Sequence, residues 1–167
     1  MSQIQKLYDY HVWANQQIFQ HLKNVPAVSL NQEAESVFPS VNAVLLHMCQ
    51  ADYVWLKTLY GETHEQIIQS LAQFKELHGD HDAIEHRMTA LYEEYGKFLT
   101  GLEDTESSIS ISHPHYGTLH TTYADIIRHV VNHGTYHRGN ISAMLHQMGH
   151  KGVPTDYIYF LYERRGE

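Results

Sequence analysis

Cysteine is nearly absent from this chain, and basic residues are few. Cys49 is the only cysteine among 167 residues, which excludes an internal disulfide and is typical of a reducing compartment. We interpret it as a small core residue. Lysine and arginine number 11 against 19 acidic residues, and the formal net charge is −8. Because the basic residues are also scattered, the chain would repel a phosphate backbone, and we expect no nucleic-acid partner.

Long apolar runs are also missing. No segment approaches the roughly 18 uninterrupted apolar residues of a membrane-spanning helix. The beginning, MSQIQKLYDYH, has neither the basic start nor the apolar stretch of a secretory signal. We therefore predict a cytoplasmic protein with no membrane partner.

The chain does have enough apolar residues for one core. They make up 43% of the 167 positions, which suits a single domain spanning residues 1–167. Apolar side chains recur at helical spacing in four long segments, and this pattern predicts four amphipathic helices. The segments are residues 2–23, 41–60, 82–102 and 122–149. Four such helices in one chain predict an all-α fold, a four-helix bundle.

The connections between these helices predict three smaller elements. Thr63 and Gln66 form a capping box that would begin a short helix between the second and third long helices. A long connection at this place permits those two helices to run parallel. Residues 103–121 alternate in polarity, which predicts a small β-like excursion before the last long helix. A short C-terminal helix led by Thr155 is expected near the end.

Three histidines, His129, His133 and His137, follow one another at four-residue intervals in the last long segment. On a helix this spacing places the imidazoles on one stripe, and two histidines one turn apart can chelate a divalent ion. His129 and His137 would lie about 12 Å apart along the axis, so one ion takes only an adjacent pair. The spacing alone does not choose between the two pairs. With 15 histidines in the chain, roughly one pair at this spacing is expected by chance.

Other histidines are less strongly indicated as ligands. His11 lies on the apolar side of the first helix and His47 at the edge of the second, where each could be a hydrogen-bonded core histidine. His47 could also meet the last long helix across the bundle. The ligand-rich run HGDHDAIEH, residues 78–86, is interpreted as solvated surface. Exposure is also expected for the loop histidines His113, His115 and His120.

Three stretches of the sequence carry a resemblance to a known family. They are YDYHVWANQQIFQHL near the start, VNAVLLHMCQADYVWL in the second helix, and RHVVNHGTYHRGNISAMLHQMG followed by PTDYIYFL. Together they resemble the DinB family of bacterial proteins over essentially the whole chain, and NHGTYHRG is the most specific part. The resemblance implies an up-down-down-up four-helix bundle, frequently a homodimer, that binds a divalent metal ion through three histidines.

The ligands that the resemblance implies, carried over by motif, are His47, His133 and His137, which leaves His129 without direct contact to the ion. Zinc or nickel is the expected cofactor. The family name refers to genes induced by DNA damage, which suggests a bacterial stress response. Related proteins of the wider superfamily resemble thiol-dependent transferases and isomerases. The resemblance therefore favours a small-molecule substrate, with a low-molecular-weight thiol as the candidate.

The ligand set indicates which chemistry such a centre would support. Three neutral imidazoles leave the full charge of the ion and at least one open coordination position, as in catalytic zinc sites. Such an ion lowers the pKa of bound water or of a thiol. The sequence has no H-E-x-x-H motif, so the candidates for a general base are His129, His11 and Asp52. Arg138 is interpreted as a bundle-edge or dimer ion pair rather than a substrate clamp.

Two functions from different classes follow. The first is a metal-dependent enzyme, either a thiol transferase or a hydrolase. The second is a non-catalytic metal-binding protein in which the histidines serve stability, storage or sensing. A fourth coordination position that exchanges water favours the enzyme, whereas closure of that position by His11 or His129 favours the second function.

Overall fold

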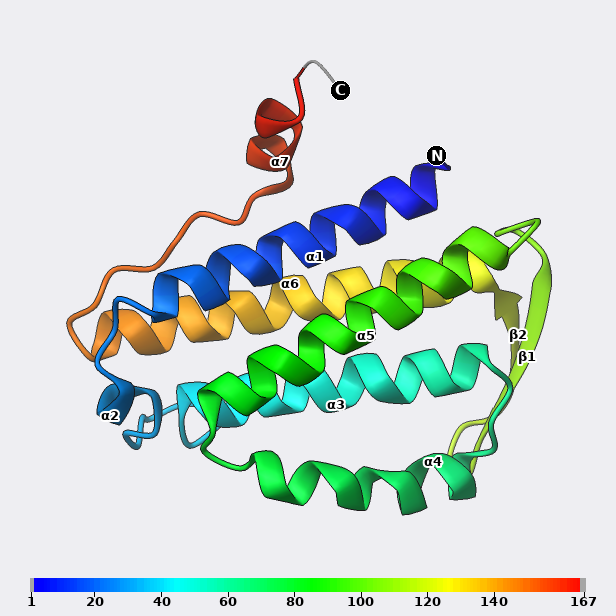
Figure 1. Cartoon of the computed structure of the whole chain (residues 1–167). Helices are drawn as coiled ribbons and strands as arrows, with labels where there is room; N and C mark the ends of the chain where they lie inside the picture. Colours follow the sequence, from blue (N-terminus) through cyan, green and yellow to red (C-terminus); the bar gives the residue numbers. More distant parts are fainter. Residues whose placement is uncertain (1, 166–167) are drawn as a thin grey trace.

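Four long helices dominate the computed structural model, which describes residues 2–165. They lie side by side along one direction (Figure 1). The helices are α1 (Gln3–Leu22), α3 (Val41–Leu59), α5 (His81–Gly101) and α6 (Tyr123–Gln147). The predicted helical bundle with a small β excursion is therefore confirmed. The bounds of the four helices differ from the predicted ones by at most two residues.

Side-chain caps fix where these helices begin. In each case a side-chain oxygen of the residue before the helix accepts a hydrogen bond from a backbone N–H of the first turn. This satisfies a donor that lacks an intrahelical partner. The capping residues of the four long helices are Ser2, Ser40, Asp80 and Thr122. The predicted capping box of Thr63 and Gln66 is also present, and it begins the short helix α4 (His64–Ser70).

The connection between α3 and α5 sets the topology of the bundle. α4 and the 3-10 helix η1 (Leu71–Leu77) run back along its length, so that α5 starts at the same end as α3 and runs parallel to it (Figure 1). α1 and α6 run in the opposite direction, with a single turn, α2 (Ala27–Leu30), in the linker between α1 and α3. This is the up-down-down-up order that the resemblance implied. α6 packs along both α1 and α3, so residues of both helices can reach it.

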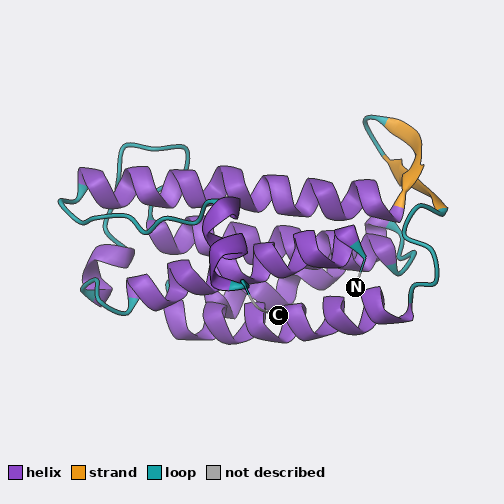
Figure 2. Ribbon diagram, turned by 90° about the horizontal axis from the view of Figure 1, so that it is seen from above, coloured by secondary structure: helices purple, strands orange, loops and turns teal. Residues whose placement is uncertain are grey.

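A two-stranded antiparallel hairpin joins α5 to α6. Its strands, β1 (Ser108–His113) and β2 (Gly117–Thr122), pair in register from one end to the other. Gly117 adopts a φ of +77° at the turn, a conformation that glycine takes without steric cost. The hairpin projects from one end of the bundle (Figure 2). Its histidines are exposed, as predicted.

Apolar residues from all four long helices form one core, and a short helix covers part of it. α7 (Tyr157–Glu163) rests on α1 through the buried Phe160, whose ring packs against Tyr10 and Trp13. The residue before α7 is Asp156, whose side chain makes no capping hydrogen bond, so the sequence prediction for the start of this helix is off by one position. In the described part of the chain, no helix combines the length and apolar character needed to span a membrane.

Candidate metal centre

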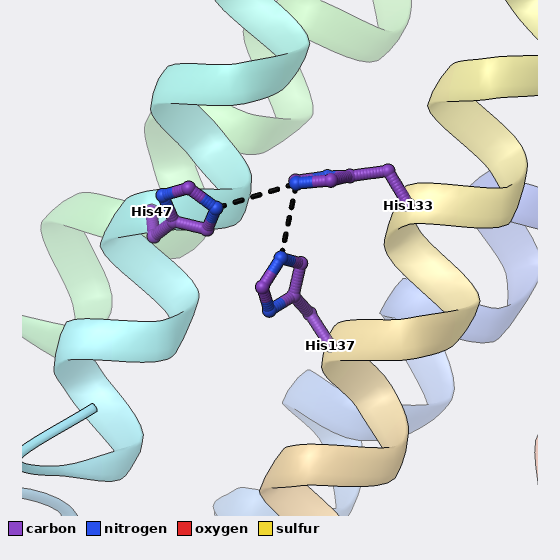
Figure 3. Close-up of side chains that lie close together, drawn as sticks. All are labelled: His47, His133 and His137. Atoms are coloured by element: carbon purple, nitrogen blue, oxygen red, sulfur yellow. Dashed lines mark hydrogen bonds between the residues drawn. The ribbon is translucent and has the colours of Figure 1, made fainter. Parts of the chain in front are cut away.

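Three histidines from two helices point their rings at one another between α3 and α6. His47 projects from α3, and His133 and His137 project from consecutive turns of α6 (Figure 3). The Nε2 atom of His133 lies 3.3 Å from that of His47 and 3.0 Å from that of His137. One nitrogen of each ring lies within 4.8 Å of the other two. We call these three residues the histidine cluster, and they are the ones that the resemblance implied as ligands.

The helices that carry these rings explain why they meet. His133 and His137 are one turn apart, so both leave α6 on the same face, and α6 packs along α3. His137 is buried, and His47 and His133 are half-buried, so the histidine cluster lies at the boundary between core and surface. Of the two adjacent pairs that the spacing allowed, this is the one brought to His47.

His129 lies one turn nearer the start of α6 and outside the histidine cluster. Its ring stacks on that of His133 at a centroid distance of 5.9 Å and meets the Trp55 ring edge-on at 4.6 Å. The side chain is exposed. His129 therefore borders the histidine cluster without joining the nitrogen atoms that converge.

Burial and mutual proximity favour neutral imidazoles in the histidine cluster. The pKa of His133 is lowered to about 4, first by burial and then by His137 and His47, while the charge of Asp52 acts in the opposite direction. The pKa of His137 is lowered to about 4 by burial and by His47. Burial also lowers the pKa of His47. Neutral imidazoles present lone pairs, and this is the form that binds a metal ion.

The separations between the ring nitrogens fit a shared divalent ion. Zinc binds imidazole nitrogen at about 2.0–2.1 Å in tetrahedral geometry, so two such nitrogens lie roughly 3.3 Å apart. The observed 3.0 and 3.3 Å are close to that value. Two neutral rings that face each other through Nε2 can share at most one proton, so the remaining lone pairs are available to a cation. Imidazole nitrogen binds several divalent transition metals, zinc and nickel among them.

Neighbouring side chains hold the rings of the histidine cluster in place. The side-chain amide of Asn140 lies 3.4 Å from Nδ1 of His137, the ring nitrogen not directed at His133. With its oxygen turned toward the ring, this amide would accept the Nδ1–H and keep Nε2 free for an ion. The Phe38 ring contacts His47 and His137 at centroid distances of 4.9 and 5.4 Å. Contacts on several sides therefore restrict the rings.

A second polar group lies in the core, against the neighbouring face of α6 that packs on α1. We call His11, Asn15, Asp52 and Arg138 the inner network, and each is no more than 2% exposed. His11 Nε2 lies 2.9 Å from Asp52 Oδ2 and 3.0 Å from Asn15 Nδ2. Arg138 donates through Nη1 to Asn15 Oδ1 at 2.9 Å and through Nη2 to Thr135 Oγ1 at 2.8 Å. A continuous chain of contacts thus joins a buried carboxylate to a buried guanidinium.

The inner network corrects two interpretations of the sequence. Arg138 is not a bundle-edge or dimer ion pair, because its guanidinium is enclosed in the core and donates to Asn15 and Thr135. Asp52 and His11 bind each other, and neither belongs to the group of converging nitrogens, which weakens both as general bases. The interpretation of His11 as a hydrogen-bonded core histidine is confirmed.

Gly134 is a residue whose role was not evident from the sequence. It follows His133 on α6, and a Cβ placed there would lie 2.5 Å from Cε1 and 2.6 Å from Nδ1 of His11. Real side chains do not approach so closely, so the missing Cβ is what lets α1 and α6 come together here. A glycine inside a helix, where alanine is more favourable, is the signal that could have indicated this contact.

Another group of possible ligands lies at the start of α5, within the 78–86 run that we interpreted as solvated surface. The group consists of His81, Asp82 and Glu85. Each offers one ligand atom, and these three atoms lie within 4.8 Å of one another. The Lys23 ammonium lies 3.0 Å from a Glu85 oxygen and already supplies a cation to this group. The start of a helix also disfavours positive charge. We therefore interpret these residues as an ion-pair cluster rather than a metal centre.

The single thiol of the chain is unsuited to catalysis. Cys49 is buried, and its pKa is raised to about 12, mainly by burial. A thiol that stays protonated at neutral pH is neither a nucleophile nor a metal ligand. Cys49 is a small core residue, as the sequence indicated.

The fold and the histidine cluster define a class of protein: up-down-down-up helical bundles with a candidate three-histidine metal centre between two helices. Residues 1–166 match the sequence model of the DinB family. The chain is 42% identical over 164 residues to Protein DinB of Bacillus subtilis (strain 168), covering 97% of this chain and 95% of that protein. The chain belongs to the DinB family, and the resemblance carried by its sequence is confirmed.

Proposed function

We propose that this DinB-family protein binds one divalent metal ion through the Nε2 atoms of His47, His133 and His137 and works as a metal-dependent enzyme. The observation that carries the proposal is the convergence of three imidazole nitrogens from α3 and α6 within coordination reach of one point. Their lowered pKa values keep the lone pairs available at neutral pH. Zinc or nickel is the ion that we expect.

Three protein ligands leave at least one coordination position for a ligand from solution. A divalent ion held there would lower the pKa of a bound thiol or water molecule and supply thiolate or hydroxide at neutral pH. The residues of the chain would bind and orient: the three histidines hold the ion, and Asn140 orients His137. Cys49 takes no part, because it is buried and protonated. The reaction class is therefore transfer of a small thiol to an electrophile, or hydrolysis.

The positions of two further histidines favour catalysis over storage or sensing. A non-catalytic site is expected to close its fourth position with another side chain. His11 instead bonds to Asp52 in the core, and His129 rests against Trp55. Neither contributes a nitrogen to the histidine cluster, and this supports a fourth position that is open to a small molecule.

The remaining parts of the proposal follow from membership of the family. We infer a homodimer in the cytoplasm, with a low-molecular-weight thiol as the small-molecule substrate and a role in bacterial stress response. Light scattering on purified protein tests the oligomeric state independently of the metal. A monomer across the micromolar range would remove the dimer from the proposal.

A thiol-transfer assay tests whether the protein is an enzyme. Untagged protein loaded with Zn²⁺ or Ni²⁺ is mixed with a small thiol and a chromogenic aryl halide, and the same protein with an activated ester tests hydrolysis. We expect a rate that His133→Ala abolishes and His146→Ala retains, because His146 is an exposed histidine on the same helix. Equal rates from wild type and His133→Ala in both assays would refute both reactions.

A further inference from the structure

A segment of the linker between α2 and α3 packs against the histidine cluster. We call this segment, residues 33–39, the strap. Its Phe38 is half-buried, and the phenyl ring contacts the rings of His47 on α3 and His137 on α6 at centroid distances of 4.9 and 5.4 Å. Phe38 therefore bridges the two helices that carry the histidine cluster. It touches two of the three rings that would hold the ion.

Few contacts attach the strap to the helices. Ala34 and Phe38 are half-buried against the core, and the other residues of the strap are exposed. Within the described residues, one hydrogen bond joins the strap to a long helix. In it the Glu35 carbonyl accepts from Gln147 Nε2 on α6, at a long 3.5 Å. Segments with so few buried contacts open at a lower free energy than the rest of a fold.

Two internal hydrogen bonds give the strap a shape of its own. The amide N–H of Ala34 donates to the carbonyl of Pro39 at 3.0 Å, and that of Ser36 donates to the carbonyl of Ala34 at 3.0 Å. The first of these bonds joins the two ends of the strap, as in compact surface loops. Ser40, the next residue, already caps α3. The strap can therefore move as one piece relative to the helices.

Toward the end of α3, the histidine cluster is bordered by a rigid element instead. There the Trp55 ring meets His129 edge-on at 4.6 Å, and His129 stacks on His133. Trp55 belongs to α3 and lies about two turns beyond His47, so displacing it means displacing a helix of the core. Phe38 is held by a loop. Of the two aromatic side chains that border the cluster, Phe38 is the one whose backbone is free to move.

We propose that the strap is a gate, and that a divalent ion and its small-molecule ligand reach the histidine cluster when Phe38 lifts away. The inference rests on the proposed function, because it requires an ion at that cluster. A phenyl ring offers no ligand atom, so opening the gate changes access to the three imidazoles and leaves the ligand set unchanged. Entry and exit cross the same barrier. The strap thereby sets how fast the ion exchanges, and not how tightly it binds.

Exchange rates of strap variants test this proposal. Phe38→Ala removes the ring, and Phe38→Leu keeps a smaller apolar side chain. Val37→Ala is the matched control, because Val37 is the neighbouring residue of the strap and is 76% exposed. Co²⁺ is the probe, since its absorption reports binding. Stopped-flow mixing with metal-free protein gives the association rate constant, and excess chelator gives the dissociation rate constant. Equilibrium titration gives the dissociation constant.

We expect Phe38→Ala to raise both rate constants about tenfold and to leave the dissociation constant within about twofold of wild type. Phe38→Leu should give a smaller increase, and Val37→Ala none. A gate acts equally on entry and exit, whereas a ring that only holds the histidines in place would change the dissociation constant. Wild-type rates in Phe38→Ala, or faster dissociation with unchanged association, would overturn the proposal. If circular dichroism shows that Phe38→Ala does not fold, wild-type rates in Phe38→Leu overturn it.

His133→Ala separates this inference from the proposed function. Unchanged Co²⁺ affinity in His133→Ala refutes the metal centre, and the gate with it. Lost affinity in His133→Ala together with wild-type exchange rates in Phe38→Ala refutes only the gate.

Discussion

α6 lies beside histidines on two neighbouring faces. The outer face carries the histidine cluster, and the inner face packs against His11 of α1. The histidines of the two faces differ in their hydrogen-bond partners. On the outer face, the rings of the histidine cluster turn their nitrogens toward one another at 3.0 and 3.3 Å. On the inner face, His11 turns Nε2 toward the carboxylate of Asp52. A buried imidazole bonded to a carboxylate is satisfied within the protein, whereas neutral rings that face one another keep lone pairs for an ion. The partner, more than the burial, therefore decides what each histidine does.

Removing the inner carboxylate should have the largest effect on the fold. Asp52→Ala leaves the buried His11 without its carboxylate partner and removes the negative charge of the inner network, and breaking such a buried pair costs about 3–5 kcal/mol of the free energy of unfolding. Chemical denaturation of the metal-free protein measures the loss. The control is Glu93→Ala, which removes an exposed carboxylate of α5. Equal stability of the two variants would mean that Asp52 has no such role in the core.

Removing an outer ring should act on metal affinity instead. His133→Ala deletes the residue whose nitrogen is closest to both partners, so we expect the dissociation constant for Zn²⁺ to rise about 100-fold or more. Isothermal titration calorimetry measures it, with His146→Ala as the control on the same helix. Similar dissociation constants for the two variants would remove His133 from the ligand set.

Adding a methyl group to Gly134 tests how closely α6 packs against His11 of α1. Gly134→Ala drives a methyl group into His11, and such overpacking costs about 2 kcal/mol. Gly139→Ala on the same helix meets nothing within 4 Å and should instead stabilise the protein by about 0.5–1 kcal/mol. Thermal denaturation of both variants measures the contrast. If both substitutions stabilise the protein, the contact between Gly134 and His11 is not restrictive.

Acid should destabilise the metal-free protein through the outer histidines. The pKa values of His133 and His137 are about 4 in the folded protein, below the ordinary value of 6.5. Between these values the unfolded chain binds protons that the folded chain does not. The free energy of unfolding therefore falls as the pH drops from 6.5 to about 4. Urea denaturation at several pH values in this range measures the free energy of unfolding. It should change less steeply with pH when both residues are alanine. An unchanged dependence on pH would assign the effect to other groups.

The smallest effect is expected at the start of α5. His81→Ala should bind as many Zn²⁺ ions per chain as wild type, because Lys23 already pairs with Glu85 in that cluster. Elemental analysis after dialysis measures the metal content. A wild type that holds one ion more than His81→Ala would make the α5 cluster a second metal centre.

The four long helices could be predicted from the sequence because helical periodicity and capping are local. The apolar spacing located each helix, and the capping box of Thr63 and Gln66 marked the start of α4. The long connection between α3 and α5 permitted the parallel pair that is observed. The sequence does not fix the first residue of α7, because Thr155 and Asp156 are both residue types that favour the position before a helix.

The sites could be predicted only in part, because their contacts join distant segments. The four-residue spacing limited the ion to an adjacent pair, but only the family resemblance pointed to His47 as the partner of His133 and His137. The inner network left no such pattern. The sequence indicated a surface position for Arg138, because arginine is rarely buried completely. Its hydrogen-bond partner Asn15 lies 123 positions earlier in the chain, too far for a local pattern to reveal.

The most direct measurement is anomalous diffraction at the metal edge from crystals of the Zn²⁺-loaded protein. We predict one strong peak between α3 and α6, about 2.1 Å from the Nε2 atoms of His47, His133 and His137, with a solvent molecule as the fourth ligand. A peak that lies elsewhere, or a fourth side chain that closes the coordination sphere, would contradict the account.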